Sequence, residues 1–242
     1  MKCSFISDLH LDADTPARND AFAALLAHEA RRCDELYILG DLTEVWVGDD
    51  DPSPFAEALR AQLLGATATC RVYLMHGNRD FLIGEAFANR CAIELLSDPH
   101  VVERNSHRLL LCHGDGLCTG DAAYQRVRAT LRSDKWQRDV LAKPIDERRR
   151  LAASMRAQSR ASNANKPSQI MDVAPDAVAR IARDHAVDAI VHGHTHRPAI
   201  HRSDGNRPIR YVLGDWDRCG WVLRFDGTFT LQRFPLGHRC EI

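Results

Sequence analysis

Residues 2–10, KCSFISDLH, decide the fold, because a short β-rich run there ends directly in side chains that can bind ligands. The same arrangement returns four times, where further β-rich runs end in GDL, HGNRD, HGDG and HGHTH. Apolar residues at helical spacing separate the first two runs and precede the last, and this alternation is typical of α/β layering. The predicted strands are Lys2–Ile6, Glu35–Leu39, Arg71–Met75, Arg108–Cys112 and Asp188–Val191.

Two regions depart from this rhythm. The C-terminal part predicts strands at Tyr211–Leu213, Trp221–Phe225 and Phe229–Phe234, with a hairpin turn at Asp226-Gly227, and we expect a second, mostly antiparallel sheet edge. Residues 120–166 show helical spacing broken at prolines, which predicts a helical insertion. The predicted domains are therefore a core, residues 1–119 and 167–242, and an inserted helical lid, residues 120–166.

The composition excludes a disordered scaffold, because 45% of the 242 residues are hydrophobic and 27% are charged. The net charge of −1 gives the whole chain no pull toward nucleic acid or anionic membrane. Residues 120–166 nevertheless hold twelve basic and five acidic side chains, a local charge of +7; such runs are often only solvated helix faces. With no signal peptide and no membrane-spanning run, we expect a cytoplasmic protein. The eight cysteines, without a C-x-x-C pair, predict reduced core thiols.

Seven side chains at the strand ends offer oxygen or nitrogen ligands. Because the carboxyl ends of neighbouring strands share one edge of an α/β sheet, we expect them to converge. Seven ligands are too many for one tetrahedral site, but they fit two metal ions that share a bridging carboxylate. The absence of cysteine among them favours a harder ion such as Mn²⁺ over structural Zn²⁺. The predicted ligands are Asp8, His10, Asp41, Asn78, His113, His194 and His196.

The motifs DLH, GDL, GNRD, HGD and GHTH, in this order, resemble those of the calcineurin-like metallophosphoesterase superfamily. The resemblance implies an α/β sandwich of two mixed sheets flanked by helices. It also implies one metal ion at Asp8, His10, Asp41 and His196, and a second at Asp41, Asn78, His113 and His194, with Asp41 bridging.

The third motif differs from the superfamily's commoner GNH form, because Arg79 replaces a histidine that protonates the leaving group. An arginine cannot donate a proton near neutral pH, but its guanidinium can hold phosphate oxygens and offset developing charge. This favours a phosphate leaving group, and hence a pyrophosphate substrate, because a phosphate leaves with little help from an acid. The alternative is that Arg79 only forms a salt bridge with Asp80.

The strings GDLTEVWVGDDD, HGNRDFLIG, HGDGLCTGDAAYQ, IMDV and HGHTHRPAIH resemble the UDP-2,3-diacylglucosamine pyrophosphohydrolases of lipid A biosynthesis in Gram-negative bacteria. In that family a helical lid after the fourth motif binds the acyl chains and the glucosamine phosphate. Thr43 replaces an aromatic residue usual in that family, and we expect it to alter the pocket wall. Charge also favours Arg156 and Lys166 near a phosphate. The predicted substrate-binding residues are Asn78, Arg79, Asp121, Tyr124, Arg156, Ser159, Asn163, Lys166 and His194.

The resemblance implies metal-dependent hydrolysis of UDP-2,3-diacylglucosamine by water attack on the α-phosphate, giving UMP and 2,3-diacylglucosamine 1-phosphate, with Arg79 and the seven ligands catalytic. We expect a monomer with two Mn²⁺ ions, peripheral on the cytoplasmic face of the inner membrane, whose basic lid faces anionic headgroups. The apolar residues of the lid would line an acyl tunnel, or simply pack the insertion onto the core. They are Tyr124, Val127, Leu131, Trp136, Val140, Leu141, Leu151 and Met155.

Three other functions agree less well with the sequence. A phosphohydrolase of soluble nucleotides, such as a dinucleoside polyphosphate or cyclic nucleotide, or of phosphoproteins has no use for adjacent apolar and basic lid residues. A non-catalytic scaffold of the same fold does not need seven intact ligands. Nucleic-acid processing is disfavoured, because the third motif lacks the donor histidine and the lid lacks a series of stacking aromatics. We therefore expect no nucleic-acid partner.

Overall fold

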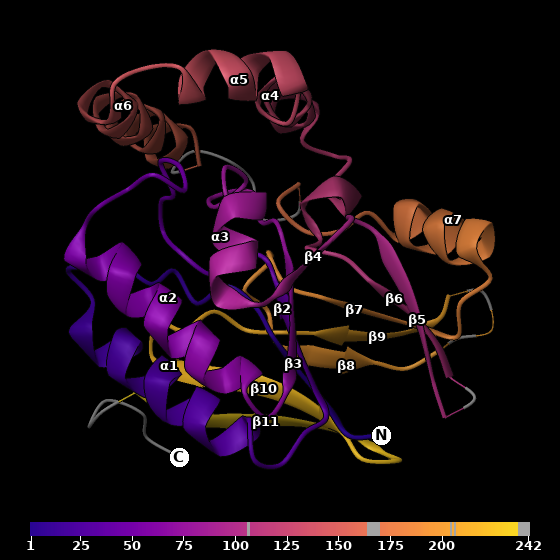
Figure 1. Cartoon of the computed structure of the whole chain (residues 1–242). Helices are drawn as coiled ribbons and strands as arrows, with labels where there is room; N and C mark the ends of the chain where they lie inside the picture. Colours follow the sequence, from indigo (N-terminus) through magenta and orange to yellow (C-terminus); the bar gives the residue numbers. More distant parts are fainter. Residues whose placement is uncertain (106, 164–169, 204, 206, 237–242) are drawn as a thin grey trace.

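Two mixed sheets pack face to face, with helices α1–α3 against the outer face of one and helix α7 against the outer face of the other (Figure 1). The structure is a computed structural model that describes residues 1–105, 107–163, 170–203, 205 and 207–236. The elements in chain order are β1 (Cys3–Ile6), α1 (Pro16–Glu29), β2 (Glu35–Leu39), α2 (Pro54–Thr67), β3 (Arg71–Met75), α3 (Glu85–Cys91), β4 (Glu94–Leu96), β5 (His100–Arg104), β6 (His107–Leu111), η1 (Asp115–Leu117), α4 (Ala122–Leu131), α5 (Asp134–Leu141), α6 (Ile145–Asn163), α7 (Pro175–His185), β7 (Ala189–His192), β8 (Ala199–His201), β9 (Ile209–Val212), β10 (Cys219–Phe225) and β11 (Phe229–Pro235).

The strand order confirms the predicted pair of mixed sheets. In the first sheet, β11-β10-β1-β2-β3-β4, the four N-terminal strands are parallel and β10 pairs with β1 antiparallel. In the second, β5-β6-β7-β9-β8, β6, β7 and β9 are parallel and both edges are antiparallel. The last two C-terminal strands, β10 and β11, form the predicted antiparallel hairpin and extend the first sheet through β1. The prediction that β9 shares this edge with β10 is wrong, because β9 pairs with β7 in the second sheet. Between β9 and β10 the chain crosses from sheet to sheet, where Trp216 N donates to Asp8 O at 3.1 Å.

The core is layered because strand side chains alternate between the two faces of a sheet. In β2, Leu36 and Ile38 pack toward α1–α3, whereas Tyr37 and Leu39 pack toward the second sheet. All five residues of β2 are buried, as expected for a parallel strand covered on both faces. This double burial holds the strand ends, and the polar residues that follow them, in fixed positions.

Several elements escaped the sequence pattern. Strands β4 and β8 have three residues each, too few to show a two-residue period. Helix α2, which the apolar spacing did not predict, begins with Pro54 after Ser53, whose hydroxyl accepts a hydrogen bond from Ala56 N at 3.2 Å. Helix α3 and strand β5 were also missed.

Six of the eight cysteines are buried free thiols, as predicted: Cys3, Cys33, Cys70, Cys91, Cys112 and Cys118. The prediction is wrong for Cys219, which is disulfide-bonded, and Cys240 lies outside the described residues.

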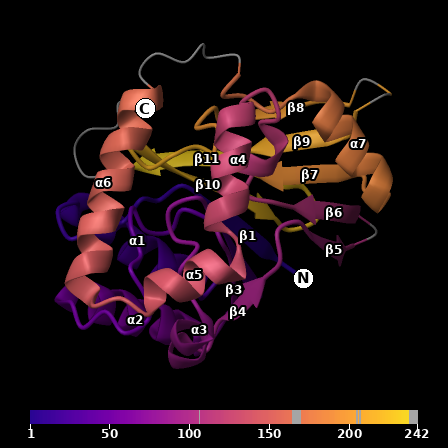
Figure 2. The same ribbon diagram turned by 90° about the horizontal axis from the view of Figure 1, so that it is seen from above.

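Helices α4, α5 and α6, residues 122–163, form the α4–α6 segment, which lies above the carboxyl ends of the strands (Figure 1). Seen from above, it makes a U in which α5 joins one end of α4 to one end of α6 (Figure 2). Among the described residues, no helix combines the length and the apolar character needed to cross a bilayer.

Candidate metal and substrate site

The five polar strand ends converge, but from two sheets rather than from the single edge expected. Asp8, Asp41 and Asn78 follow β1, β2 and β3 of the first sheet, whereas His113 and His194 follow β6 and β7 of the second. Backbone hydrogen bonds continue between the loops beyond the strands, with Asp8 N donating to Gly40 O at 3.1 Å and Gly193 N to His113 O at 2.9 Å. The ligand loops are therefore held in register by main-chain contacts.

Left-handed backbone conformation turns alternate side chains toward one point. Asp8 and His10, at i and i+2, have φ of 55° and 49°, and His194 and His196 have φ of 67° and 55°. Asp41 has φ of 52°. A non-glycine residue rarely adopts positive φ, and such strain clusters at functional sites.

Two glycines permit the close approach of these loops. A Cβ on Gly77 would overlap the carboxylate of Asp41, and one on Gly193 would overlap that of Asp8. The GNRD and GHTH motifs therefore need glycine before the ligand residue for a steric reason.

The first group of possible metal ligands comprises Asp8, His10, His196 and Asp41. Asp8, His10 and His196 offer ligand atoms that all lie within 4.8 Å of one another. The Nε2 atoms of His10 and His196 are 3.4 Å apart, and His196 Nε2 lies 3.4 Å from Asp8 Oδ1. Asp8 Oδ1 is buried and makes no hydrogen bond. A buried carboxylate oxygen without a donor is expected where a cation belongs.

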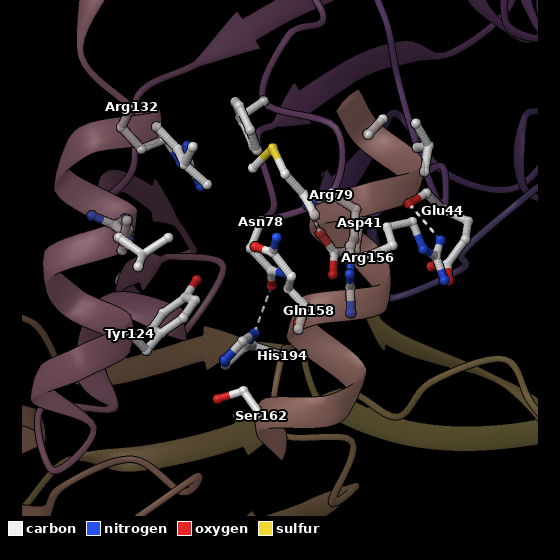
Figure 3. Close-up of a pocket in the computed structure, with 18 of the residues that line it drawn as sticks. Asp41, Glu44, Asn78, Arg79, Tyr124, Arg132, Arg156, Gln158, Ser162 and His194 are labelled. Carbon is white, nitrogen blue, oxygen red and sulfur yellow. Dashed lines mark hydrogen bonds and ion pairs between the residues drawn. The ribbon is translucent and has the colours of Figure 1, made fainter. Parts of the chain in front are cut away.

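The second group is centred on Asn78. Its Oδ1 lies 3.1 Å from His113 Nε2 and 2.9 Å from His194 Nδ1. Figure 3 shows Asn78 and His194 pointing toward each other beside Asp41. Two imidazoles, an amide oxygen and a carboxylate are a suitable donor set for a divalent transition metal.

Asp41 lies between the two groups. Its Oδ2 is 3.7 Å from His10 Nε2 and 3.8 Å from His113 Nε2, while its Oδ1 accepts a hydrogen bond from Arg79 N at 2.8 Å. The backbone thus fixes one oxygen and leaves the other facing both groups. This arrangement fits a carboxylate that bridges two cations, so the residues present fit the metal that the family implies.

Hydrogen bonds behind the histidines fix their orientation. His10 Nδ1 contacts Glu44 Oε2 at 2.8 Å, His113 Nδ1 contacts Leu39 O at 2.9 Å, and His196 Nδ1 lies 3.5 Å from Asp215 Oδ2. In each case the second ring nitrogen is left to face the cluster, as in carboxylate–histidine–metal arrangements. Sequence reasoning missed Glu44 and Asp215, although Glu44 lies within the GDLTE string.

The pKa values reflect this concentration of charge. Burial raises the pKa of the Asp41 carboxyl, whereas at Asp8 the interactions with His196 and His113 outweigh burial and lower it. At His113 the charges of Asp41 and Asp8 overcome burial and raise the pKa to about 9. Burial lowers the pKa of His194 to about 3. Protonated histidine therefore balances the buried carboxylates, a role that a bound cation would take over.

A cavity of about 550 Å³ extends from this cluster to the α4–α6 segment. Figure 3 shows its two flanks, with Tyr124 and Arg132 on one side, Arg156 and Ser162 on the other, and Asn78 and Arg79 between them. Of the predicted tunnel residues, those lining the cavity are Tyr124, Val127, Leu131, Trp136, Val140, Leu151 and Met155. Leu141 does not line it: the residue is 40% exposed, and its Cδ2 lies close to Gly48 of the core.

Ion pairs with the core hold several arginines of the α4–α6 segment, contrary to the expectation that they face headgroups. Arg128 Nε donates to Asp115 Oδ2 at 2.7 Å, and Arg148 Nη2 to Asp50 Oδ2 at 2.6 Å. Arg149 pairs with Asp51, and Arg156 pairs with Glu44. Asp115, another residue that sequence reasoning missed, also accepts a hydrogen bond from the Tyr124 hydroxyl at 2.8 Å.

The other predicted substrate residues are placed as follows. Asp121 caps α4 by accepting from Tyr124 N at 3.0 Å, and both Asp121 and Ser159 line the cavity. The side chain of Asn163, and Lys166 as a whole, lie outside the described residues.

Thr43 is fully buried and is absent from the cavity wall, which Glu44, Val45, Trp46 and Val47 form instead. An effect of Thr43 on the packing of the wall, and so on acyl-chain length preference, stays a prediction.

Arg79 is not held by Asp80. The Asp80 carboxylate is buried and accepts hydrogen bonds from Gly77 N and Leu42 N, each at 2.7 Å. No ion pair joins Arg79 to Asp80 within the described residues. Arg79 lines the cavity, and its buried Nε has no hydrogen-bond partner there.

The sandwich and its acid–histidine cluster are those of a phosphoesterase: the chain belongs to the calcineurin-like phosphoesterase family, whose sequence pattern matches residues 1–198. A relative from Pseudomonas savastanoi pv. phaseolicola, named UDP-2,3-diacylglucosamine hydrolase, is 50% identical over 95% of this chain and 94% of its own. A relative of the same name from Pseudomonas aeruginosa is 46% identical over 98% of this chain and 100% of its own. Among solved structures, an archaeal phosphodiesterase matches 97% of this chain and 100% of its own, at 12% identity and a TM-score of 0.47.

Proposed function

We propose that this protein hydrolyses the pyrophosphate bond of UDP-2,3-diacylglucosamine and releases UMP and 2,3-diacylglucosamine 1-phosphate for lipid A biosynthesis. The observation that carries this proposal is the continuity of the acid–histidine cluster with a cavity whose far wall is apolar. A substrate that joins a diphosphate to acyl chains fits both ends of such a cavity. The relatives named UDP-2,3-diacylglucosamine hydrolase, up to 50% identical, support the same substrate.

The cluster acts at the diphosphate end. Two Mn²⁺ ions, when bound by the two ligand groups that share Asp41, would supply Lewis acidity and a nucleophile at neutral pH. The oxygen of water forms a bond to the α-phosphorus, and the bond from this phosphorus to the bridging oxygen breaks. The electron pair stays with the departing 2,3-diacylglucosamine 1-phosphate, and the two protons of the water pass to the product phosphates or to solvent. A phosphate is stable as an anion, so the site needs no proton donor at the position of Arg79.

Arg79 stabilises the transferring group. Its guanidinium reaches the cavity with a buried Nε free of hydrogen bonds, while its backbone N–H orients Asp41. A planar guanidinium can bind two phosphate oxygens at once and offset the charge that develops on them. Asn78 and His194 lie beside it at the same end of the cavity.

The segment of residues 120–166 acts as a lid inserted into a core of residues 1–119 and 167–242. Its apolar side chains cover the acyl chains, and Asp121, Tyr124, Ser159, Asn163 and Lys166 contact the sugar phosphate. The protein works as a monomer at the cytoplasmic face of the inner membrane, where its lipid substrate resides.

Product analysis tests this function. The chelator-treated protein is given UDP-2,3-diacylglucosamine in ¹⁸O-labelled water with and without Mn²⁺, and a dinucleoside polyphosphate serves as the competing substrate. We expect Mn²⁺-dependent turnover of the lipid, with the label in UMP, and its loss in His10→Ala. Turnover of the soluble nucleotide alone would replace the substrate assignment, and label in the lipid product would move the attack to the β-phosphate. No turnover of either would favour a non-catalytic scaffold.

A further inference from the structure

Glu44 connects a candidate metal ligand to the α4–α6 segment. Its carboxylate oxygens have separate partners: Oε2 lies 2.8 Å from His10 Nδ1, and Oε1 forms an ion pair with Arg156 Nη2. Arg156 Nη1 also donates to the backbone carbonyl of Glu44 at 3.2 Å. Figure 3 shows Arg156 reaching from α6 to Glu44.

The contact with His10 determines which ring nitrogen faces the cluster. A carboxylate at 2.8 Å from Nδ1 favours the tautomer that carries its proton there, which leaves the lone pair on Nε2. That Nε2 points to Asp41 Oδ2 at 3.7 Å and to His196 Nε2 at 3.4 Å. Glu44 thus presents His10 in the form that can bind a cation.

Glu44 belongs to the core, whereas Arg156 belongs to the lid. Glu44 N donates to Leu11 O at 2.9 Å, and Leu11 N donates to Leu42 O at 3.0 Å, so Glu44 lies on the loops that carry His10 and Asp41. When α6 is docked, Arg156 fixes the rotamer of the Glu44 carboxylate and offsets its charge. A carboxylate that is already oriented costs less conformational entropy when it holds His10.

We propose that Glu44 is a positioning residue that links the docking of α6 to metal binding at His10. This rests on the proposed metal site, but not on the identity of the substrate. Because such linkage is reciprocal, a metal ion at His10 stabilises the docked α6 by the same free energy that docked α6 adds to metal binding. The lid therefore closes most firmly over a metal-loaded site.

A second ion pair supplies the matched control. Arg148, also on α6, binds both oxygens of Asp50 at 2.6 Å, and within the described residues Asp50 contacts no candidate metal ligand. Asp50→Asn therefore weakens the docking of α6 through a contact remote from His10. Arg156→Gln weakens it through Glu44, without touching the metal itself.

The test measures Mn²⁺ affinity by titration calorimetry without substrate, together with amide hydrogen exchange of α6 with and without Mn²⁺. In the wild-type chain we expect Mn²⁺ to slow exchange in α6. Arg156→Gln should lower Mn²⁺ affinity about fivefold or more, the lower end of typical coupling, and abolish this protection. Glu44→Ala should lower affinity about 10- to 100-fold, as loss of a residue behind a ligand usually does. Arg156→Lys, which keeps the charge, should retain part of the Mn²⁺ affinity and part of the Mn²⁺-dependent protection that Arg156→Gln loses.

The Asp50→Asn control and three contrary results distinguish failure of the linkage, of the metal site and of the proposed function. Asp50→Asn should speed exchange in α6, but α6 stays docked most of the time and keeps the Glu44–Arg156 pair, so Mn²⁺ affinity and Mn²⁺-dependent protection should persist. Unchanged Mn²⁺ affinity in a folded Arg156→Gln variant, with α6 exchange indifferent to Mn²⁺, would overturn the linkage. Absence of Mn²⁺ binding to the wild-type chain would overturn the metal site and the linkage together. Intact linkage without lipid hydrolysis would overturn only the proposed function.

Discussion

Histidine and aspartate at the strand ends are held in a backbone conformation that their side chains disfavour. Asp8, His10, Asp41, His194 and His196 all have positive φ between 49° and 67°. Left-handed conformation costs an L-residue roughly 1–2 kcal/mol relative to the right-handed helical region. The native fold tolerates this conformational cost because main-chain hydrogen bonds join the loops and the strands beside them are buried. Together these contacts hold the backbone of each loop in its conformation.

This strain predicts an unusual ranking of two substitutions at His196, whose side chain is 41% exposed and so contributes little packing. We expect metal-free His196→Gly to be more stable than metal-free His196→Ala by about 1 kcal/mol, because glycine accepts a φ of 55° and alanine does not. Urea unfolding of the two variants measures the difference. Elsewhere on the surface, at a position with negative φ, the order should reverse.

The position of Arg79 in the cavity leads to a second prediction, which concerns kcat. Arg79→Lys keeps the positive charge and the backbone N–H that orients Asp41, but loses the planar fork. We expect kcat for UDP-2,3-diacylglucosamine to fall about 10²- to 10³-fold, as for loss of one oxyanion donor, with little change in Mn²⁺ affinity. Steady-state kinetics beside metal titration checks both values. A large loss of metal affinity would instead assign Arg79 to the assembly of the site.

At this scale the sequence supplied the identities of the clustered residues but not the residues behind them. Asp8 and His10 could be found because they follow a strand directly and have ligand-type side chains. Glu44, Asp115 and Asp215 could not, because acidic residues are common on surfaces and only the fold shows that these three contact His10, Arg128 and His196.

Among the secondary-structure elements, α4–α6 determines what the site can hold. The segment presents apolar side chains to the cavity and is joined to the core by arginines paired with Asp115, Asp50, Asp51 and Glu44. These ion pairs attach both α4 and α6 to the core. The apolar side chains that line the cavity are therefore available to contact a ligand. Helical spacing predicted the segment, but the direction of each side chain depends on docking, which explains the error at Leu141.

Leu141 and Leu151 provide a matched pair of apolar positions in this segment. Leu151 lines the cavity and Leu141 does not. We expect Leu151→Ala to lower kcat/KM for the long-chain substrate about 5- to 30-fold, for roughly 1–2 kcal/mol of lost apolar contact. Leu141→Ala should leave it near the wild-type value. A substrate analogue with short acyl chains measures whether the loss depends on the chains; equal losses with both substrates would argue against acyl contact.

The strands themselves were mostly predictable, whereas their assignment to sheets was not. Five buried runs ended in polar motifs, and all five are strands within a residue or two of the expected bounds. The pairing of β9 with β7, and of β10 with β1, depends on contacts between residues far apart in the sequence. Local patterns carry no information about such pairing, so the place of β9 in the second sheet was predicted wrongly, whereas the antiparallel β10–β11 hairpin was predicted correctly.

The whole molecule has an uneven distribution of charge. The net charge of the chain is −1, yet residues 120–166 carry +7, and the segment that contains most of them covers one end of the sandwich (Figure 1). Core carboxylates pair with five of its arginines, but Arg126, Arg138, Arg150 and Arg160 are exposed and form no ion pair within the described residues. An anionic bilayer would therefore attract the end of the molecule where the cavity lies.

This asymmetry predicts oriented binding to anionic vesicles, in addition to the proposed chemistry. Each basic residue near such a surface contributes about 1 kcal/mol, so replacing the four exposed arginines by glutamine should lower binding at least tenfold. The matched control replaces Arg31, Arg32, Arg183 and Arg202, which are exposed on the core, and changes the net charge equally. Vesicle co-sedimentation at low and high salt measures both variants, because screening should abolish the difference. An equal loss in both would show that net charge, rather than the α4–α6 segment, determines binding to the vesicles.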